Sequence, residues 1–161
     1  MSMILLRIWL MMQADRLIDG IDFSAQPDNE VWYVTTDGAL TTDSDIQLIG
    51  GSYRQEGLRT VAHFCEDGIC KVRYNAKLEM FGEKAFYDTR NIKIISLPRT
   101  LSHINAFSLG TQSTSIDLIF LYAGNVYCNE VFPPKARILY VQKGCGQFYK
   151  NLGYKVIEKN I

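Results

Sequence analysis

The chain has 161 residues, which fits one domain with a substantial core. Apolar residues make up 47% and charged residues 21%, a composition typical of a folded globular protein that excludes a disordered chain. The 17 basic and 17 acidic side chains balance to zero net charge, which counts against a nucleic-acid-binding protein.

Residues 3–12 form an apolar run that is interrupted only by Arg7. The pattern from Ile4 to Ile18 predicts a helix that ends at Asp19-Gly20. The apolar run is about half the roughly 20 residues of a transmembrane helix, so we expect no membrane span. It lacks a basic start and a cleavage site of small residues, so it is no convincing signal peptide, although a poorly chosen start or a remnant export signal stays an alternative. The main interpretation is an apolar helix that packs on the rest of the domain or on a second chain.

A β-rich unit is expected next. The β-branched and aromatic run 31–35 is typical of a strand, and Asp37-Gly38 indicates a hairpin turn. Further strands are expected from near Ala39 and at 46–49, 58–64 and 69–74.

Short apolar strands recur in the second half of the chain. They begin at Val72, Ile95, Ile119 and Leu139, with steps of 23, 24 and 20 residues, and such a period indicates a solenoid. One unit of this kind cannot close a core alone, but stacked units share a continuous core and a short parallel sheet.

Four motifs also follow one another in a specific order. They are 29–38, with its strand and Asp-Gly turn, the repeat-like segments 72–86 and 95–104, and a closing segment, 139–145, followed by Tyr149, Tyr154 and Ile157. Together, over roughly residues 28–158, they resemble the BspA-like leucine-rich repeat proteins of bacteria. The resemblance implies an α/β fold, a right-handed leucine-rich-repeat solenoid of short parallel strands with a β-rich N-terminal cap and a small helical C-terminal cap.

The domain organisation follows from this resemblance. An apolar N-terminal helix is expected over 1–26 and the β-rich cap over 27–68; repeats and C-terminal cap follow over 69–161, all in one folded unit. Members of the family are mostly secreted or cell-surface proteins of gut and oral bacteria that bind proteins or other host surfaces. They share no catalytic site or cofactor. The resemblance therefore implies a non-catalytic module that binds a protein or glycan.

Motifs that would favour an enzyme or a metal site are weak. His63, Cys65, Cys70 and His103 match no usual zinc spacing, so no metal site is expected. Cys145 lies in a tight turn, but no histidine is near it in sequence to act as a base, so a structural role at the start of a cap helix is preferred. The four cysteines leave thiols and disulfides equally open. No catalytic residue, cofactor or nucleic-acid partner is predicted.

The strand pattern does predict a partner surface. If Val72, Ile95, Ile119 and Leu139 point inward, their neighbours form two outward columns on the sheet, and exposed apolar strips usually mark partner sites. The predicted contact residues are Arg73, Ile94, Ser96, Leu118, Phe120, Ile138 and Tyr140. The alternatives are that the chain itself or a sister chain covers this strip, or that a strand phase is wrong by one residue.

The functional hypotheses follow in order. The first is recognition of a protein or glycan through the sheet face. The second is a structural module that forms homodimers through the apolar N-terminus and the sheet strip. A hydrolase of unknown type is third.

Overall fold

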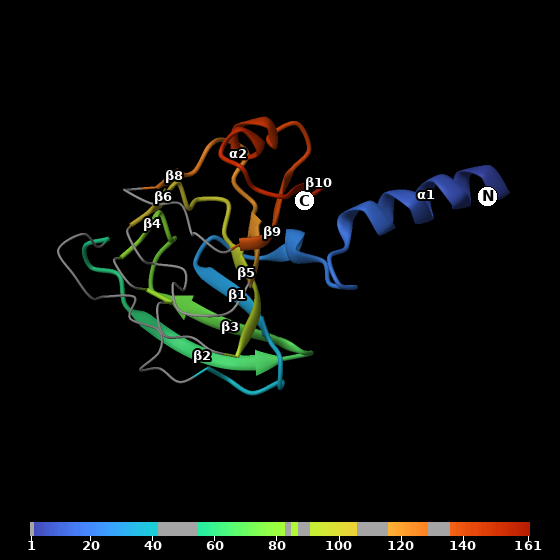
Figure 1. Ribbon diagram of the computed structural model, residues 1–161. Coiled ribbons are helices and arrows are strands. Elements are labelled where there is room, and N and C mark those ends of the chain that lie inside the picture. The colour runs from blue at the N-terminus through green and yellow to red at the C-terminus, as the bar shows by residue number, and fades with distance from the viewer. Residues whose placement is uncertain (1, 42–54, 83–84, 87–90, 106–115, 129–135) are drawn as a thin grey trace.

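A seven-stranded mixed sheet lies at the centre of the protein (Figure 1). The computed structural model describes residues 2–41, 55–82, 85–86, 91–105, 116–128 and 136–161. The helices are α1 (Met3–Arg16), the short 3-10 turn η1 (Phe23–Ala25) and α2 (Gln147–Asn151). The strands are β1 (Glu30–Thr35), β2 (Thr60–Glu66), β3 (Ile69–Tyr74), β4 (Met80–Phe81), β5 (Ile92–Leu97), β6 (His103–Ile104), β7 (Ile116–Phe120), β8 (Tyr127–Cys128), β9 (Ala136–Gln142) and β10 (Val156–Lys159).

The large sheet joins two kinds of pairing. Its strand order is β10-β9-β7-β5-β1-β3-β2. Strands β2, β3, β1 and β5 pair antiparallel, whereas β5, β7, β9 and β10 pair parallel. A second, three-stranded parallel sheet has the order β4-β6-β8. The fold is thus a mixed α/β fold dominated by a seven-stranded sheet, with few helices in its described part.

Both faces of the sheet are covered. One face carries the main core, to which β1 contributes Val31 and Tyr33. On the opposite face, Trp32 belongs to a second core with Ile18, Phe23, Ile94, Ile119, Leu121 and Ile161. Because successive side chains of a strand point to opposite faces, an almost continuous apolar strand such as β1 serves both cores.

The predicted strands of the first half have mixed outcomes. The strands expected near 31–35, 58–64 and 69–74 are confirmed as β1, β2 and β3. The hairpin expected at Asp37-Gly38 is wrong, because β1 pairs with β3 and β5 rather than with the residues after its turn. Residues 39–41 are not in a strand, and the rest of the strand expected from Ala39 lies outside the described residues. The strand expected at 46–49 lies outside the described residues.

The expected phase of β7 is also wrong, by one residue. Leu118 and Phe120 point into the main core, and Ile119 lies in the second core. Leu118, and not Ile119 as expected, is the residue of β7 that pairs with Ile95 of β5 and Leu139 of β9. The alternation of polar and apolar residues could not show which side chains of β7 face the main core, because the segment from Ile116 to Leu121 is apolar at every position but one.

Candidate interaction surface

Helix α1 is the most exposed apolar element among the described residues. Ser2 caps it, with its side-chain oxygen accepting a hydrogen bond from the Leu5 backbone N–H at 3.3 Å. No glycine or proline interrupts the helix, and Leu17 ends it with extended backbone. No residue of α1 is buried, and the helix projects from the rest of the protein (Figure 1). None of the described helices combines the length and apolarity that crossing a membrane requires.

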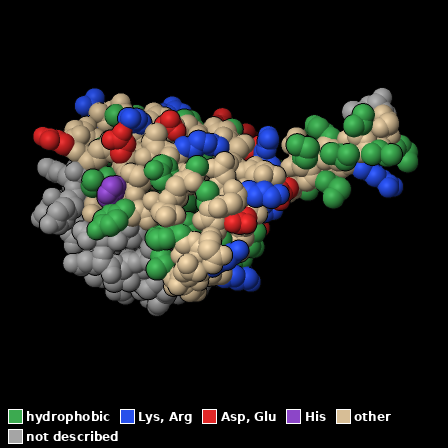
Figure 2. All heavy atoms as spheres, turned by 90° about the horizontal axis from the view of Figure 1, so that it is seen from above, with side chains coloured by type: hydrophobic (Ala, Val, Ile, Leu, Met, Phe, Trp, Pro, Cys, Tyr) green, Lys and Arg blue, Asp and Glu red, His purple; other side chains and the backbone are tan. Residues whose placement is uncertain are grey.

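Apolar side chains lie all around α1, because every position from 3 to 12 except Arg7 is apolar; those on the side turned to the viewer are seen in Figure 2. Nine large apolar residues of the helix are between 41% and 73% exposed: Met3, Ile4, Leu5, Leu6, Ile8, Trp9, Leu10, Met11 and Met12. Together they present roughly 1,000 Å² of surface, more than the roughly 300–600 Å² of the largest apolar patch on an ordinary monomer. A helix that is apolar all round is normally buried, so the surface of α1 is typical of a helix that packs against a partner.

The segment after α1 behaves differently, because it packs on the sheet. Ile18 and Phe23 are buried in the second core, and Ile18 and Ile21 bridge each other across a turn in which Asp19 and Gly20 have positive φ. Gln26, also buried, donates hydrogen bonds to the backbone oxygens of Glu30 and Ser96. The helix predicted to extend to Ile18 therefore ends earlier, and residues 17–26 form a covering strap instead.

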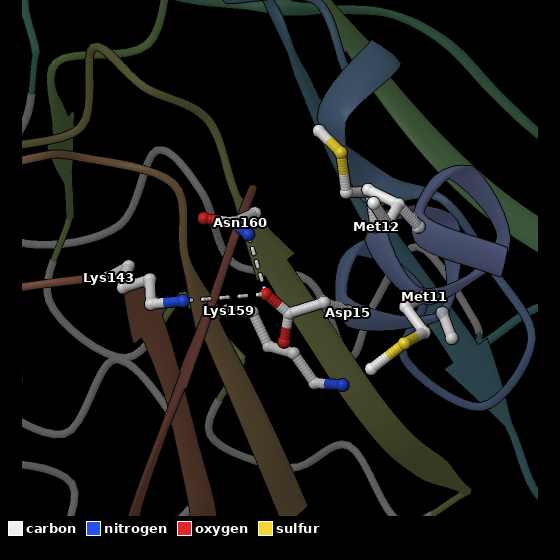
Figure 3. Close-up of a pocket in the computed structure, with 8 residues that line it drawn as sticks. Met11, Met12, Asp15, Lys143, Lys159 and Asn160 are labelled. Atoms are coloured by element: carbon white, nitrogen blue, oxygen red, sulfur yellow. Dashed lines mark hydrogen bonds and ion pairs between the residues drawn. The ribbon is translucent and has the colours of Figure 1, made fainter. Parts of the chain in front are cut away.

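A notch lies between the base of α1 and the end of the sheet (Figure 3). Its volume is about 670 Å³; α1 contributes Ile8, Met11, Met12, Ala14 and Asp15, and the C-terminal part of the chain contributes Lys143, Lys159 and Asn160. The Asp15 carboxylate accepts a hydrogen bond from Asn160 Nδ2 at 2.6 Å and lies 4.0 Å from Lys143 Nζ. This site was not predicted from the sequence, because only the tertiary fold brings residues 143–160 to the helix.

The sheet-face residues predicted to contact a partner do not form one exposed strip. Ile94, Ser96, Leu118 and Phe120 are at most 1% exposed, the first two beneath the strap side of the sheet and the last two in the main core. Ile138 and Tyr140 are partly buried, and Arg73 is exposed. The chain itself therefore buries four of the seven predicted residues, two on each face of the sheet.

Two carboxylates on the strap side of the sheet are held by arginines. Glu30, with a side chain 3% exposed, accepts from Arg73 Nε and from Trp32 Nε1, both at 2.6 Å. Asp117, also 3% exposed, receives a bidentate pair of hydrogen bonds from Arg137, at 2.9 and 2.7 Å. These hydrogen bonds and the carboxylate charge raise the pKa of Arg137. In each pair the arginine neutralises a buried carboxylate, so a structural role accounts for both ion pairs.

One group of cations and aromatic rings remains at the β2–β3 end of this face. Lys71 Nζ lies 4.9 Å from the centre of the Trp32 ring and 5.8 Å from that of Phe64. Arg73 lies 5.3 Å from the Phe64 ring, and both distances to Phe64 are within the range of cation–π attraction. Arg73 is the one member of this group that the strand pattern predicted as a contact residue, and it is exposed.

The residues considered for a metal site each make a structural contact instead. Cys65 and Cys70 form a disulfide across paired positions of the β2–β3 hairpin. His63 contacts the Tyr33 hydroxyl, while the His103 ring lies 5.1 Å from the Tyr127 ring, centre to centre, and is tilted against it by 53°. Within the described residues, no group of three or more histidine, cysteine or acidic side chains could hold a metal ion.

Cys145 does not cap the last helix. Its thiol donates to the backbone oxygen of Ala123 at 2.8 Å, and the cap position before α2 belongs to Gly146, whose N–H donates to Glu158.

The comparisons with known proteins add no relative: no family model matches the chain, and no similar curated protein or solved structure was found.

Proposed function

We propose that this protein is a non-catalytic interaction module whose contact element is helix α1. The observation that carries the proposal is the set of nine large apolar side chains that α1 exposes on all its sides. Water disfavours such a surface at about 25 cal/mol per Å², and an interface removes that penalty. The strap that follows α1 is anchored in the second core, so the helix is presented from a fixed point on the domain.

The proposal includes a leucine-rich-repeat solenoid of the BspA-like type as the scaffold. Its support is the pair of parallel ladders. In the small sheet, Met80, His103 and Tyr127 are paired neighbours at steps of 23 and 24 residues. In the large sheet, Ile95, Leu118 and Leu139 are paired neighbours at steps of 23 and 21 residues. Repeating units of a solenoid would place one strand in each ladder at such steps.

The test compares the full chain with a chain that begins at Leu17. The truncation removes α1 but retains the strap, so the shorter chain should keep its circular dichroism spectrum and its melting temperature. The full chain should either associate in solution or bind vesicles of phosphatidylcholine and phosphatidylglycerol, and the shorter chain should do neither. Identical behaviour of the two chains in both assays would refute the role of α1.

A second candidate is recognition of a protein or glycan through the exposed end of the sheet face. The cation–aromatic group of Phe64, Lys71 and Arg73 favours it, because flat aromatic and cationic side chains are common in contact sites. Binding on a glycan array should then be lost in Phe64→Ser and retained in the chain that begins at Leu17. Loss of binding in the shorter chain alone would assign the ligand to α1.

A further inference from the structure

The charges on α1 indicate which partner the helix takes. Arg7 lies within the apolar run and Asp15 in the last turn, eight residues apart, so they lie about 80° apart around the helix, on the same side. Arg16, nine residues from Arg7, lies on the opposite side. A charge in the middle of an apolar surface is expensive to bury unless an opposite charge meets it.

We propose that the partner of α1 is the α1 of a second copy of the chain, packed antiparallel about a two-fold axis at Met11. In that register Arg7 of each copy faces Asp15 of the other, and Ile8 faces the small side chain of Ala14. The two ion pairs lie symmetrically, each about 6 Å along the helix from the axis. This inference rests on the proposed role of α1 as the contact element.

The notch makes Asp15 accessible to such a partner. The side chain of Asp15 is 38% exposed, and its contacts with Asn160 and Lys143 both involve the single oxygen Oδ2. Figure 3 shows its carboxylate at the edge of the notch between α1 and the end of the sheet. Within the described residues, Arg7 forms no ion pair and no side-chain hydrogen bond. Each copy therefore offers one unmatched cation and one carboxylate with an accessible oxygen.

The exposed area also fits a dimer. The roughly 1,000 Å² of apolar surface on α1 is comparable to the approximately 800 Å² that each partner buries in a standard stable interface. An antiparallel partner helix covers the side of α1 that carries Arg7, Met11 and Asp15, and the walls of the partner's notch cover a further part of the helix. The notch would receive apolar side chains of the incoming helix.

A lipid surface fits less well. Helices that lie in a membrane interface have a polar face rich in lysine and arginine, which α1 lacks. A helix inserted end-on would carry Arg7 into the hydrocarbon, where no carboxylate is available to pair with it. These two features favour a second copy of the chain over a bilayer.

Charge exchange tests the register. The full chain, R7E, D15R and the double variant R7E/D15R are measured by sedimentation velocity from about 1 to 100 µM. The parent should be a dimer, and each single variant should weaken dimerisation by at least about tenfold, because two like-charged contacts replace two ion pairs. The double variant, and an equimolar mixture of the two single variants, should regain the dimer. R16E, which makes the same charge change on the opposite side of α1, is the matched control and should leave the mass unchanged.

Cross-linking gives an independent readout. Met11→Cys lies on the proposed axis, so it should form an intermolecular disulfide under mild oxidation; Trp9→Cys, away from the axis, should not. A monomeric parent that binds vesicles through α1 would overturn the second copy as partner, yet leave α1 as the contact element. A dimer that is lost in the chain beginning at Leu17 but not restored by the mixture would overturn the Arg7–Asp15 register alone. Equal behaviour of the full and truncated chains would overturn both proposals.

Discussion

Replacing Phe23 by alanine tests whether the strap is part of the folded domain. Phe23 is fully buried, with its ring centre 6.4 Å from that of Trp32, and it packs in the second core with Ile94 and Ile119. Removing the ring leaves a cavity between the strap and the sheet, and such changes cost about 3–5 kcal/mol. In a domain of this size each kcal/mol shifts the melting temperature by about 2–4 °C, so Tm should fall by roughly 6–20 °C.

Thermal and urea unfolding, followed by far-ultraviolet circular dichroism, measure this loss. Trp9→Ala is the matched control, because it removes a large aromatic side chain that is 53% exposed on α1. It should change the free energy of unfolding by less than about 0.5 kcal/mol. If the two substitutions lowered stability equally, the strap would not be anchored as described, and the boundary between contact helix and domain would have to move.

Three further predictions concern the body of the domain. Burial, followed by the nearby Tyr33, raises the pKa of Tyr74, so the folded state keeps its proton after the unfolded state has lost it, and stability should fall above a pH of about 10. Because the buried Tyr74 hydroxyl has no hydrogen-bond partner among the described residues, Tyr74→Phe should reduce that alkaline fall and should raise stability at neutral pH by about 1 kcal/mol in urea titrations. Replacing Cys65 and Cys70 together by alanine should cost about 2 kcal/mol, since their disulfide closes only a short loop, and intact mass before and after reduction should show the bond in the parent. Arg73→Met should lower stability by about 1–2 kcal/mol, a value discounted for the half-exposed arginine, because it leaves the Glu30 carboxylate buried without its cation; an unchanged urea midpoint would contradict this.

Local sequence signals were sufficient for much of the sheet. β-branched and aromatic runs bounded by turn residues predicted β1, β2 and β3, and the period of the later strands predicted parallel neighbours. The partner of β1 was not predictable, because the turn at Asp37-Gly38 specifies a local change of direction and not which strand pairs with β1. In the structure Asp37 instead accepts hydrogen bonds from Ala39 N–H and from Asn91, which lies just before β5.

The candidate interaction surface was only partly predictable for a related reason. The apolar run that forms α1 is plain in the sequence, but whether it packs on its own domain depends on tertiary structure. The division at Leu17 follows from the strap, whose apolar residues Ile18 and Phe23 look in sequence like a continuation of the same run. The notch combines Asp15 with residues near the C-terminus, and no local pattern links segments so far apart.

Ile94 and Ile138 distinguish a covered sheet face from an exposed partner site. Both lie in one row on the strap side of the sheet, on either side of Asp117. Ile94 is fully buried against the strap, so Ile94→Ala should cost about 2–5 kcal/mol, whereas Ile138 is only partly buried and Ile138→Ala should cost clearly less. If the row were a binding surface open to solvent, both substitutions would leave the urea midpoint nearly unchanged. A large loss for Ile94 alone would mean that any recognition through the sheet is restricted to its uncovered end, and that α1 presents the larger apolar surface to a partner.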